Sequence, residues 1–164
     1  MADEYKRRNA DITNLKCAGF EVDMVDNRLQ EFSVKFHGPR GTNYEGGVWS
    51  VNVFLASDYP VMYPILQFSD KIYHPNISYA TGTVCVNVLR QAWKNGHDLK
   101  LLFGTFLPQL LKEPNVDRPF NLEAANLMKN DPSAYEQKVR DETEEHAKPA
   151  AVNAAAEETA ESTD

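Results

Sequence analysis

One residue near the middle of the chain has a side chain that can act as a nucleophile. Cys85 is one of only two cysteines and lies between two valines, in the same segment as the tripeptide His74-Pro75-Asn76. The Cys85 thiol can be a nucleophile or a small buried hydrophobe. Asn76 can be a turn residue that is hydrogen-bonded within its own loop. His74 is expected to be structural and bonded to backbone, rather than to transfer protons.

Cys85 and Asn76 fall in a segment, residues 74–93, that holds too many Pro, Gly, Asn, Ser and Thr residues for a strand or a helix. Its apolar residues are frequent enough to hold it against a core, so the pattern predicts a long ordered loop. A loop of this length in a small domain is usually functional. Pro75 near its start and Trp93 at its end are expected to be structural.

Period-two alternation precedes this loop. Apolar residues alternate with polar ones in two runs: Phe32, Val34 and Phe36, then Trp49, Val51, Val53 and Leu55. With further strands over residues 20–25 and 65–68, the pattern predicts a four-stranded antiparallel meander. The glycines between residues 38 and 47 are interpreted as turn residues, because they form no GxxxxGK[ST] motif and no helix follows them.

A helical pattern precedes the meander. Residues 3–17 contain no Gly or Pro and predict a short surface helix. Lys6, Arg7 and Arg8 are expected to be exposed on it as a basic patch. Such a patch can bind an acidic partner or can simply be solvated.

Three helices are predicted after the loop. Asp98 can cap the first, which carries a stripe of leucine and phenylalanine and in which Pro108 predicts a local kink. The second covers residues 122–129. The third begins at Asp131, with proline at its first position, and is expected to fray at its acidic end.

The composition indicates one domain, residues 1–148, and a tail, residues 149–164. The net charge of −7 arises within residues 141–164, where eight acids face one lysine, so residues 1–140 sum to zero. This balance argues against nucleic-acid binding. No apolar run is long enough for a membrane span, and no His/Cys spacing predicts a metal site. The tail lacks large apolar side chains apart from Val152 and is expected to be disordered.

The order of elements and a series of motifs resemble the ubiquitin-conjugating enzymes. The motifs are YEGGVW at 44–49, DYP at 58–60, YHPNI at 73–77, GTVC ending at Cys85, Trp93, and EPN at 113–115. The resemblance covers residues 5 to about 146. Within the family the chain is most similar to the H-type subgroup, through KRR near its start, the EFSVKF strand, FLPQLL at 106–111 and the acidic tail.

This resemblance implies an α+β ubiquitin-conjugating fold with an N-terminal helix, the four-stranded meander, a long active-site loop and three C-terminal helices. It implies a transferase that accepts ubiquitin from the activating enzyme as a thioester on Cys85. Ubiquitin then passes to a lysine of a protein substrate, with or through a ubiquitin ligase. Asn76 would steady the oxyanion or the loop. ATP is consumed by the activating enzyme, so no metal or bound cofactor is implied.

The resemblance also implies two partner surfaces. The first helix, with Lys6, Arg7 and Arg8, would meet the activating enzyme. Ligases would dock on two loops, formed by Tyr59, Pro60 and Val61 and by Lys94, Asn95 and Gly96. Val61 replaces the family's usual phenylalanine, and residues 94–96 replace its usual Ser-Pro-Ala, so an altered set of ligases is expected. We expect a monomer in the cytoplasm, the nucleus or both, without nucleic-acid or membrane partners.

Two carboxylates common in the family are missing near the cysteine. Many members have an aspartate two residues after the cysteine and an acid before the Pro-Leu that follows EPN, where this chain has Asn87 and Arg118. A carboxylate near the thioester helps to deprotonate the attacking lysine. Its replacement predicts weak intrinsic reactivity toward lysine. Asp117 is the nearby acid that can substitute, and it is therefore a candidate catalytic residue.

Three alternatives remain open at this point. The chain can conjugate a ubiquitin-like modifier instead of ubiquitin, or it can be a non-catalytic scaffold of the same fold, although the presence of Cys85 argues against a scaffold. An unrelated cysteine hydrolase is disfavoured because no histidine is obviously paired with Cys85. Cys17 lies outside every motif and is expected to be a bystander.

Overall fold

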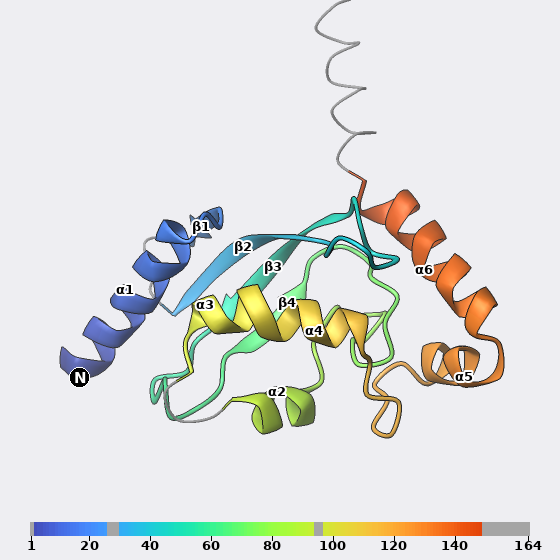
Figure 1. The fold of residues 1–164 in the computed structure, drawn as a ribbon. Helices are drawn as coiled ribbons and strands as arrows, with labels where there is room; N and C mark the ends of the chain where they lie inside the picture. Colours follow the sequence, from blue (N-terminus) through green and yellow to red (C-terminus); the bar gives the residue numbers. More distant parts are fainter. Residues whose placement is uncertain (1, 26–29, 94–96, 149–164) are drawn as a thin grey trace, which may run out of the picture.

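The computed structural model describes residues 2–25, 30–93 and 97–148. Helix α1 (Ala2–Cys17) lies at one end of the molecule, and α5 (Leu122–Asn130) and α6 (Pro132–His146) lie at the other (Figure 1). Between them, one face of a four-stranded sheet is covered by a row of consecutive helical segments, α3 (Leu99–Leu101), η1 (Leu102–Phe106) and α4 (Leu107–Lys112). The element order confirms the predicted α+β architecture.

The sheet is antiparallel and has the order β1-β2-β3-β4. Its strands are β1 (Val22–Met24), β2 (Glu31–His37), β3 (Val48–Phe54) and β4 (Ile65–Phe68). Every second residue of β2 and β3 is buried, and Phe36 pairs with Trp49 on the core face. The predicted meander is confirmed. Strand β1 is shorter than expected because its ladder with β2 ends at Met24.

The helical row opposite the sheet is not a single α-helix. Asp98 caps it as predicted, since its side chain accepts a hydrogen bond from the Leu101 N–H at 2.9 Å. Segment η1 is a π-helix, in which the Leu107 N–H bonds the Leu102 carbonyl. This wide turn ends immediately before α4, where Pro108 takes an early position. The chain thus accommodates a residue without an N–H through a π-turn, where the sequence predicted a local kink.

Helices α5 and α6 both begin at side-chain caps. Asn121 accepts a hydrogen bond from the Ala124 N–H at 3.1 Å, and Asp131 accepts one from the Ala134 N–H at 3.2 Å. In contrast to the predicted fraying, α6 is continuous to His146. Glu142 provides the reason: its carboxylate accepts a hydrogen bond from the Tyr79 hydroxyl at 2.8 Å and lies 3.3 Å from the ring of His146.

The segment predicted as one long loop is ordered, but its second half is helical. Helix α2 (Val86–Ala92) begins directly after Cys85. The sequence pattern does not predict this helix, because the valines at 86 and 88 have only modest helix propensity. Burial of Val88 and Leu89 stabilises it instead. Tertiary packing therefore overrides the local preference.

The sequence predicted no membrane span, no metal site and a disordered tail. In the described residues, no helix combines the length and the apolar character needed to cross a membrane. The same residues contain no group of three or more His, Cys, Asp or Glu placed to hold a metal ion. The tail, residues 149–164, lies outside the described residues, so its disorder stays a prediction.

Candidate active site

Cys85 stands at the junction between the loop and α2, where it is the residue preceding the helix. Its N–H donates to the Asn76 carbonyl at 2.8 Å, which fixes the cysteine backbone against the tripeptide. The residue is 8 % exposed. It lines an open groove of about 420 Å³, the active-site groove, whose other lining residues are Val86, Asn87, Arg118, Pro119 and Phe120. The backbone of Cys85 is therefore fixed, while an acceptor side chain can approach from the groove.

The Asn76 side chain lies behind this groove and is not one of its lining residues. It is fully buried, and its Oδ1 accepts a hydrogen bond from the Asn115 N–H at 2.8 Å. Its Nδ2 donates to the Asn115 carbonyl at 2.7 Å and, over a longer 3.4 Å, to the Arg118 carbonyl. These bonds use the amide oxygen and both amide protons. Asn76 thus ties the loop to the segment that carries Arg118.

His74 holds the same loop from the other side. The Asn76 N–H donates to its Nδ1 at 2.9 Å, so the proton of the neutral ring is on Nε2, which donates to the Leu110 carbonyl at 2.8 Å. Burial lowers the pKa of His74 to about 4, although the bond to Leu110 opposes the shift. The ring is neutral at pH 7 and both nitrogens bond within the fold. This placement agrees with the structural role expected for His74.

Pro75 completes the tripeptide's contacts. It is buried, and its carbonyl accepts hydrogen bonds from the N–H groups of Phe120 at 2.7 Å and Asn121 at 2.9 Å. The three residues therefore connect α4 with the segment before α5, including its N-cap residue Asn121. This is a framework for the groove, built from backbone partners.

The two replaced family positions both face the groove. Asn87 is partly exposed and Arg118 is exposed, and both line the groove with Cys85. Within the described residues, the Arg118 side chain has no hydrogen bond or ion pair. Asp117 is exposed and outside the groove lining, with its N–H bonded to Asn115 Oδ1 at 3.1 Å. The structure thus brings Arg118, and not Asp117, to the cysteine.

The N-terminal basic residues differ in exposure. Lys6 is exposed, whereas Arg7 is half-buried, with its Nε 2.8 Å from Asp11 Oδ2 and its Nη2 donating to the His97 carbonyl at 2.5 Å. Arg8 is only 8 % exposed. Its Nη2 donates to the Ala56 carbonyl at 2.6 Å. The expectation of a three-residue exposed patch is wrong for Arg8, because its guanidinium reaches across to a carbonyl in the β3–β4 connection.

Tyr59 also lies inside the molecule. It is fully buried, its hydroxyl donates to the Asp11 carboxylate, and its ring packs on Trp93 with centroids 5.8 Å apart. Burial, followed by the bond to Asp11, raises its pKa above the usual value. The expectation that Tyr59 contacts ligases is therefore corrected: its side chain links α1 to the segment after α2. Sequence reasoning missed Asp11, which carries no motif.

The neighbouring positions of the predicted ligase surface are more open. Pro60 is partly buried, and its carbonyl accepts a hydrogen bond from Trp93 Nε1 at 2.8 Å. This bond holds Trp93 in place, as expected of a structural residue. Val61 is 83 % exposed, so an apolar side chain is presented to solvent here. Lys94, Asn95 and Gly96 lie outside the described residues.

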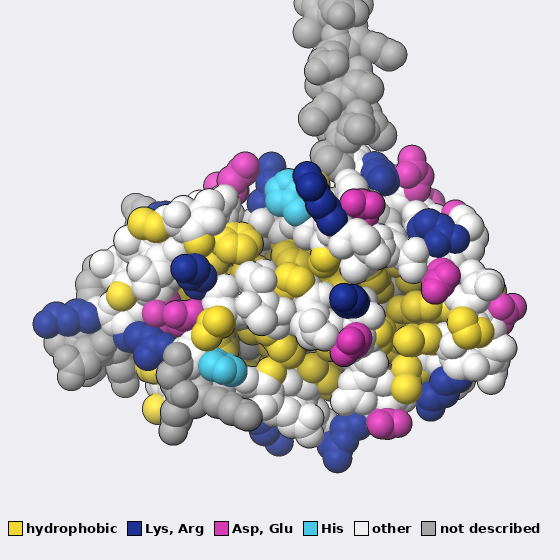
Figure 2. Space-filling model, in the orientation of Figure 1, with side chains coloured by type: hydrophobic (Ala, Val, Ile, Leu, Met, Phe, Trp, Pro, Cys, Tyr) yellow, Lys and Arg dark blue, Asp and Glu magenta, His cyan; other side chains and the backbone are white. Residues whose placement is uncertain are grey.

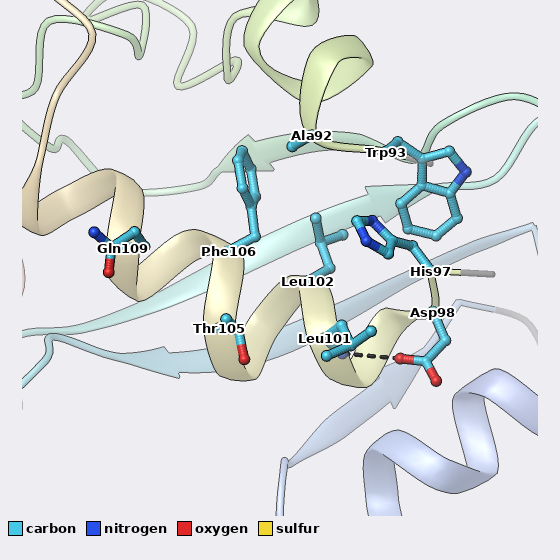
Figure 3. Close-up of a pocket in the computed structure, with 9 residues that line it drawn as sticks. All are labelled: Ala92, Trp93, His97, Asp98, Leu101, Leu102, Thr105, Phe106 and Gln109. Atoms are coloured by element: carbon cyan, nitrogen blue, oxygen red, sulfur yellow. Dashed lines mark hydrogen bonds between the residues drawn. The ribbon is translucent and has the colours of Figure 1, made fainter. Parts of the chain in front are cut away.

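A second hollow, the apolar pocket, adjoins this surface. It has a volume of about 270 Å³ and lies between the end of α2 and the helical row, as Figure 3 shows. Trp93 and His97, which bracket residues 94–96 in the sequence, line one side, and Leu102 and Phe106 line the other. Cys85 does not line it. In Figure 2 apolar side chains gather over the middle of this face, and most charged side chains lie toward its edge.

The fold and the site together define an acyl-carrier architecture: a small α+β domain that presents one cysteine in an open groove, with a buried His-Pro-Asn tripeptide behind it. Among solved structures, the E2 domain of a Toxoplasma gondii ubiquitin-conjugating enzyme matches with a TM-score of 0.80 and 28 % identity, over 88 % of this chain and 99 % of that chain. The family model for ubiquitin-conjugating enzyme matches residues 1–143.

Curated relatives agree. Ubiquitin-conjugating enzyme E2-23 kDa of Triticum aestivum is 46 % identical, over 91 % of this chain and 81 % of its own length. Ubiquitin-conjugating enzyme E2-24 kDa of Saccharomyces cerevisiae is 39 % identical, over 90 % of this chain and 67 % of its own. The chain belongs to the ubiquitin-conjugating enzyme family. It is a transferase that acts through a thioester, which disfavours the hydrolase and scaffold alternatives.

Proposed function

We propose that Cys85 is the residue that receives ubiquitin from the activating enzyme and transfers it to a substrate lysine, with or through a ubiquitin ligase. One observation carries this assignment: Cys85 lines the open groove while its backbone is fixed by the Asn76 carbonyl. The other cysteine, Cys17, is exposed on α1. Cys17 does not line this groove and is not bonded to the Asn76 carbonyl.

The chemistry of the groove suits a carrier. In charging, the Cys85 thiolate attacks the ubiquitin carbonyl that is joined to the activating enzyme; the new C–S bond forms as the bond to the activating enzyme breaks, and the activating enzyme's group leaves. In discharge, an amine attacks the thioester carbonyl, the C–N bond forms, the C–S bond breaks, and the thiolate leaves. A thioester is reactive toward amines, and the acyl group arrives already activated, so Cys85 needs no paired base.

Asn76 serves this reaction by holding the groove's wall. Its buried amide is engaged with Asn115 and Arg118, which supports the loop-steadying alternative. For Asn76 to stabilise an oxyanion, its long 3.4 Å bond to the Arg118 carbonyl would be exchanged for one to the substrate. Asp117 remains a candidate base only if the 115–118 segment moves, because its side chain is outside the groove lining.

The partner surfaces follow from exposure. We place the activating enzyme on α1 at Lys6, since Arg7 and Arg8 are engaged within the fold. Ligases are placed at Pro60 and Val61, next to the apolar pocket beyond Trp93. Membership of the H-type subgroup, a monomeric state, and action in the cytoplasm or nucleus are the remaining parts of this proposal, supported by the sequence resemblance.

A charging assay tests the assignment. The protein is incubated with activating enzyme, ATP and either ubiquitin or one ubiquitin-like modifier at a time, and adducts are resolved on a non-reducing gel. We expect a reductant-sensitive adduct with ubiquitin, absent in Cys85→Ala and retained in Cys17→Ala. Loss of the adduct in a correctly folded Cys17→Ala protein would overturn the choice of cysteine, and charging by another modifier alone would overturn the choice of ubiquitin.

A further inference from the structure

Arg118 gives the active-site groove a positive charge that no ion pair neutralises within the described residues. It is the only charged residue among the groove's lining residues. Its side chain is exposed, and within the described part of the chain it has no ion-pair or hydrogen-bond partner. Its backbone, in contrast, is held by the Asn76 side chain through the carbonyl. Arg118 therefore combines a backbone held in place with an exposed cationic side chain, in the same groove as Cys85.

The rest of the groove is apolar or neutral. Val86 is 38 % exposed and Phe120 is 49 % exposed, so two apolar side chains of the groove lining face solvent. Asn87 adds a neutral amide. A surface with one cation and flanking apolar side chains complements a segment that carries one carboxylate among apolar residues.

We infer that the groove selects acceptor lysines that have a carboxylate close to them in the substrate, and that Arg118 recognises this carboxylate. The inference rests on the proposed function of Cys85. An approaching lysine ammonium alone is repelled by Arg118, whereas a neighbouring Asp or Glu side chain pairs with the guanidinium, which forms bidentate bonds with carboxylates. The acceptor thus supplies the negative charge that this groove lacks.

The transfer step balances without a further reactant. With the acceptor's carboxylate on Arg118, its neutral amine attacks the thioester carbonyl and forms the C–N bond as the C–S bond breaks. The surplus proton of the amine passes to water, and the Cys85 thiolate leaves and later regains a proton from solvent. Arg118 touches the acceptor but not the bonds that change, so it acts as a specificity-determining residue.

Discharge to matched peptides tests the inference. The ubiquitin thioester of the full chain is formed, ATP is removed, and single-lysine peptides are added that differ only in having Glu, Gln or Arg beside the lysine. An exposed ion pair changes a binding constant by about two- to five-fold, so we expect the Glu peptide to react about two- to five-fold faster than the Gln peptide at low salt. That advantage should shrink at about 0.5 M NaCl.

Three variants make the test specific. Arg118→Gln should remove the preference for the Glu peptide, and Arg118→Glu should reverse it in favour of the Arg peptide. Arg90→Gln is the matched control, because Arg90 is exposed on α2 but does not line the groove, and it should keep the preference. Thiol exchange with 2-mercaptoethanol reports the reactivity of the thioester itself and should be unchanged in all three.

Several results would overturn the inference while leaving the proposed function intact. The first is full charging of the unmodified protein without any preference for the Glu peptide. The second is a preference for the Glu peptide in Arg118→Gln equal to that of the unmodified protein. The third is a parallel fall of thiol exchange in Arg118→Gln, which would assign Arg118 to thioester reactivity. Failure of Cys85 to charge at all would instead refute the proposed function. The two failures are therefore distinguishable.

Discussion

The two walls of the active-site groove use their polar residues in opposite ways. The inner wall, defined here as His74, Asn76 and Asn115, lies behind the lining residues and bonds to backbone groups, and the side chains of His74 and Asn76 are fully buried. The outer wall, Asn87, Arg118 and Phe120, faces solvent. Positioning of the thioester is therefore built into the fold, whereas contact with the acceptor depends on side chains that the fold does not require.

The sharpest test of this division is at Cys85, where both walls meet. Cys85→Ser changes one atom, so the inner wall should still position it and an oxyester should accumulate in place of the thioester. The adduct should survive reductant and break in alkali, a complete change in chemistry that a gel in each condition detects. An adduct in Cys85→Ser that reductant still removes would place the reactive thiol elsewhere.

The next largest effect concerns His74 in the inner wall. Because burial lowers its pKa to about 4, the unfolded chain takes up a proton near pH 6.5 while the folded chain does not until about pH 4. Stability should therefore fall as the pH drops through this window, by at most about 3 kcal/mol, and level off below it. Urea unfolding at several pH values measures the change.

Two variants isolate the contribution of His74. His74→Gln should flatten the pH dependence in this window, although it lowers stability at every pH. His37 is exposed on β2, and His37→Gln should leave the curve unaltered. Curves of the same shape in His74→Gln and the unmodified protein would show that His74 is not the buried titrating group.

The outer wall should control discharge to lysine. With Arg118 in the groove where many relatives have an acid, the charged protein should react slowly with free lysine yet exchange quickly with a small thiol. Arg118→Asp should speed lysine discharge, and Asp117→Ala should slow it if Asp117 substitutes for the missing acid, since a general base contributes about 10² or more in rate. Unchanged discharge in Asp117→Ala would remove Asp117 from the site.

Stability should distinguish the walls directly. Asn76→Ala leaves the Asn115 N–H without its partner inside the protein, which costs about 1–3 kcal/mol. Arg118→Ala removes an exposed, unpaired side chain and should change stability by less than about 0.5 kcal/mol. Melting temperatures of the two variants, compared at equal concentration, provide the measurement. Equal losses would erase the distinction between a structural and an open wall.

The smallest effect is expected from the tail. Deleting residues 149–164 should leave charging and melting temperature nearly unchanged, because the segment has no large apolar side chain except Val152. Partner binding by the truncated and the full chain is compared at low and high salt, and any weakening should be salt-dependent. A large fall in melting temperature would show that the tail packs on the domain.

The sequence predicted the inner wall and the sheet better than the surfaces. Alternation at Phe32 to Phe36 located β2 because burial on one face dictates the residue pattern. The sequence pattern did not locate α2, because this helix contains valines of modest helix propensity and is stabilised by packing. Nor did it show that Arg8 and Tyr59 are buried, because their partners lie 48 residues away in the chain, beyond any local pattern.

The π-turn at η1 constrains how the length of this chain can change. A π-turn holds one residue more than the α-helical turn it replaces, so deleting one residue within Leu102–Phe106 would let this turn close as a regular α-helix. Leu107, Leu110 and Leu111 would stay on the face that is now buried. Pro108 would then lie inside a regular helix, where it lacks an N–H to donate and clashes with the carbonyl four residues before it. A one-residue deletion here would therefore lower stability through Pro108 and not through loss of the apolar face.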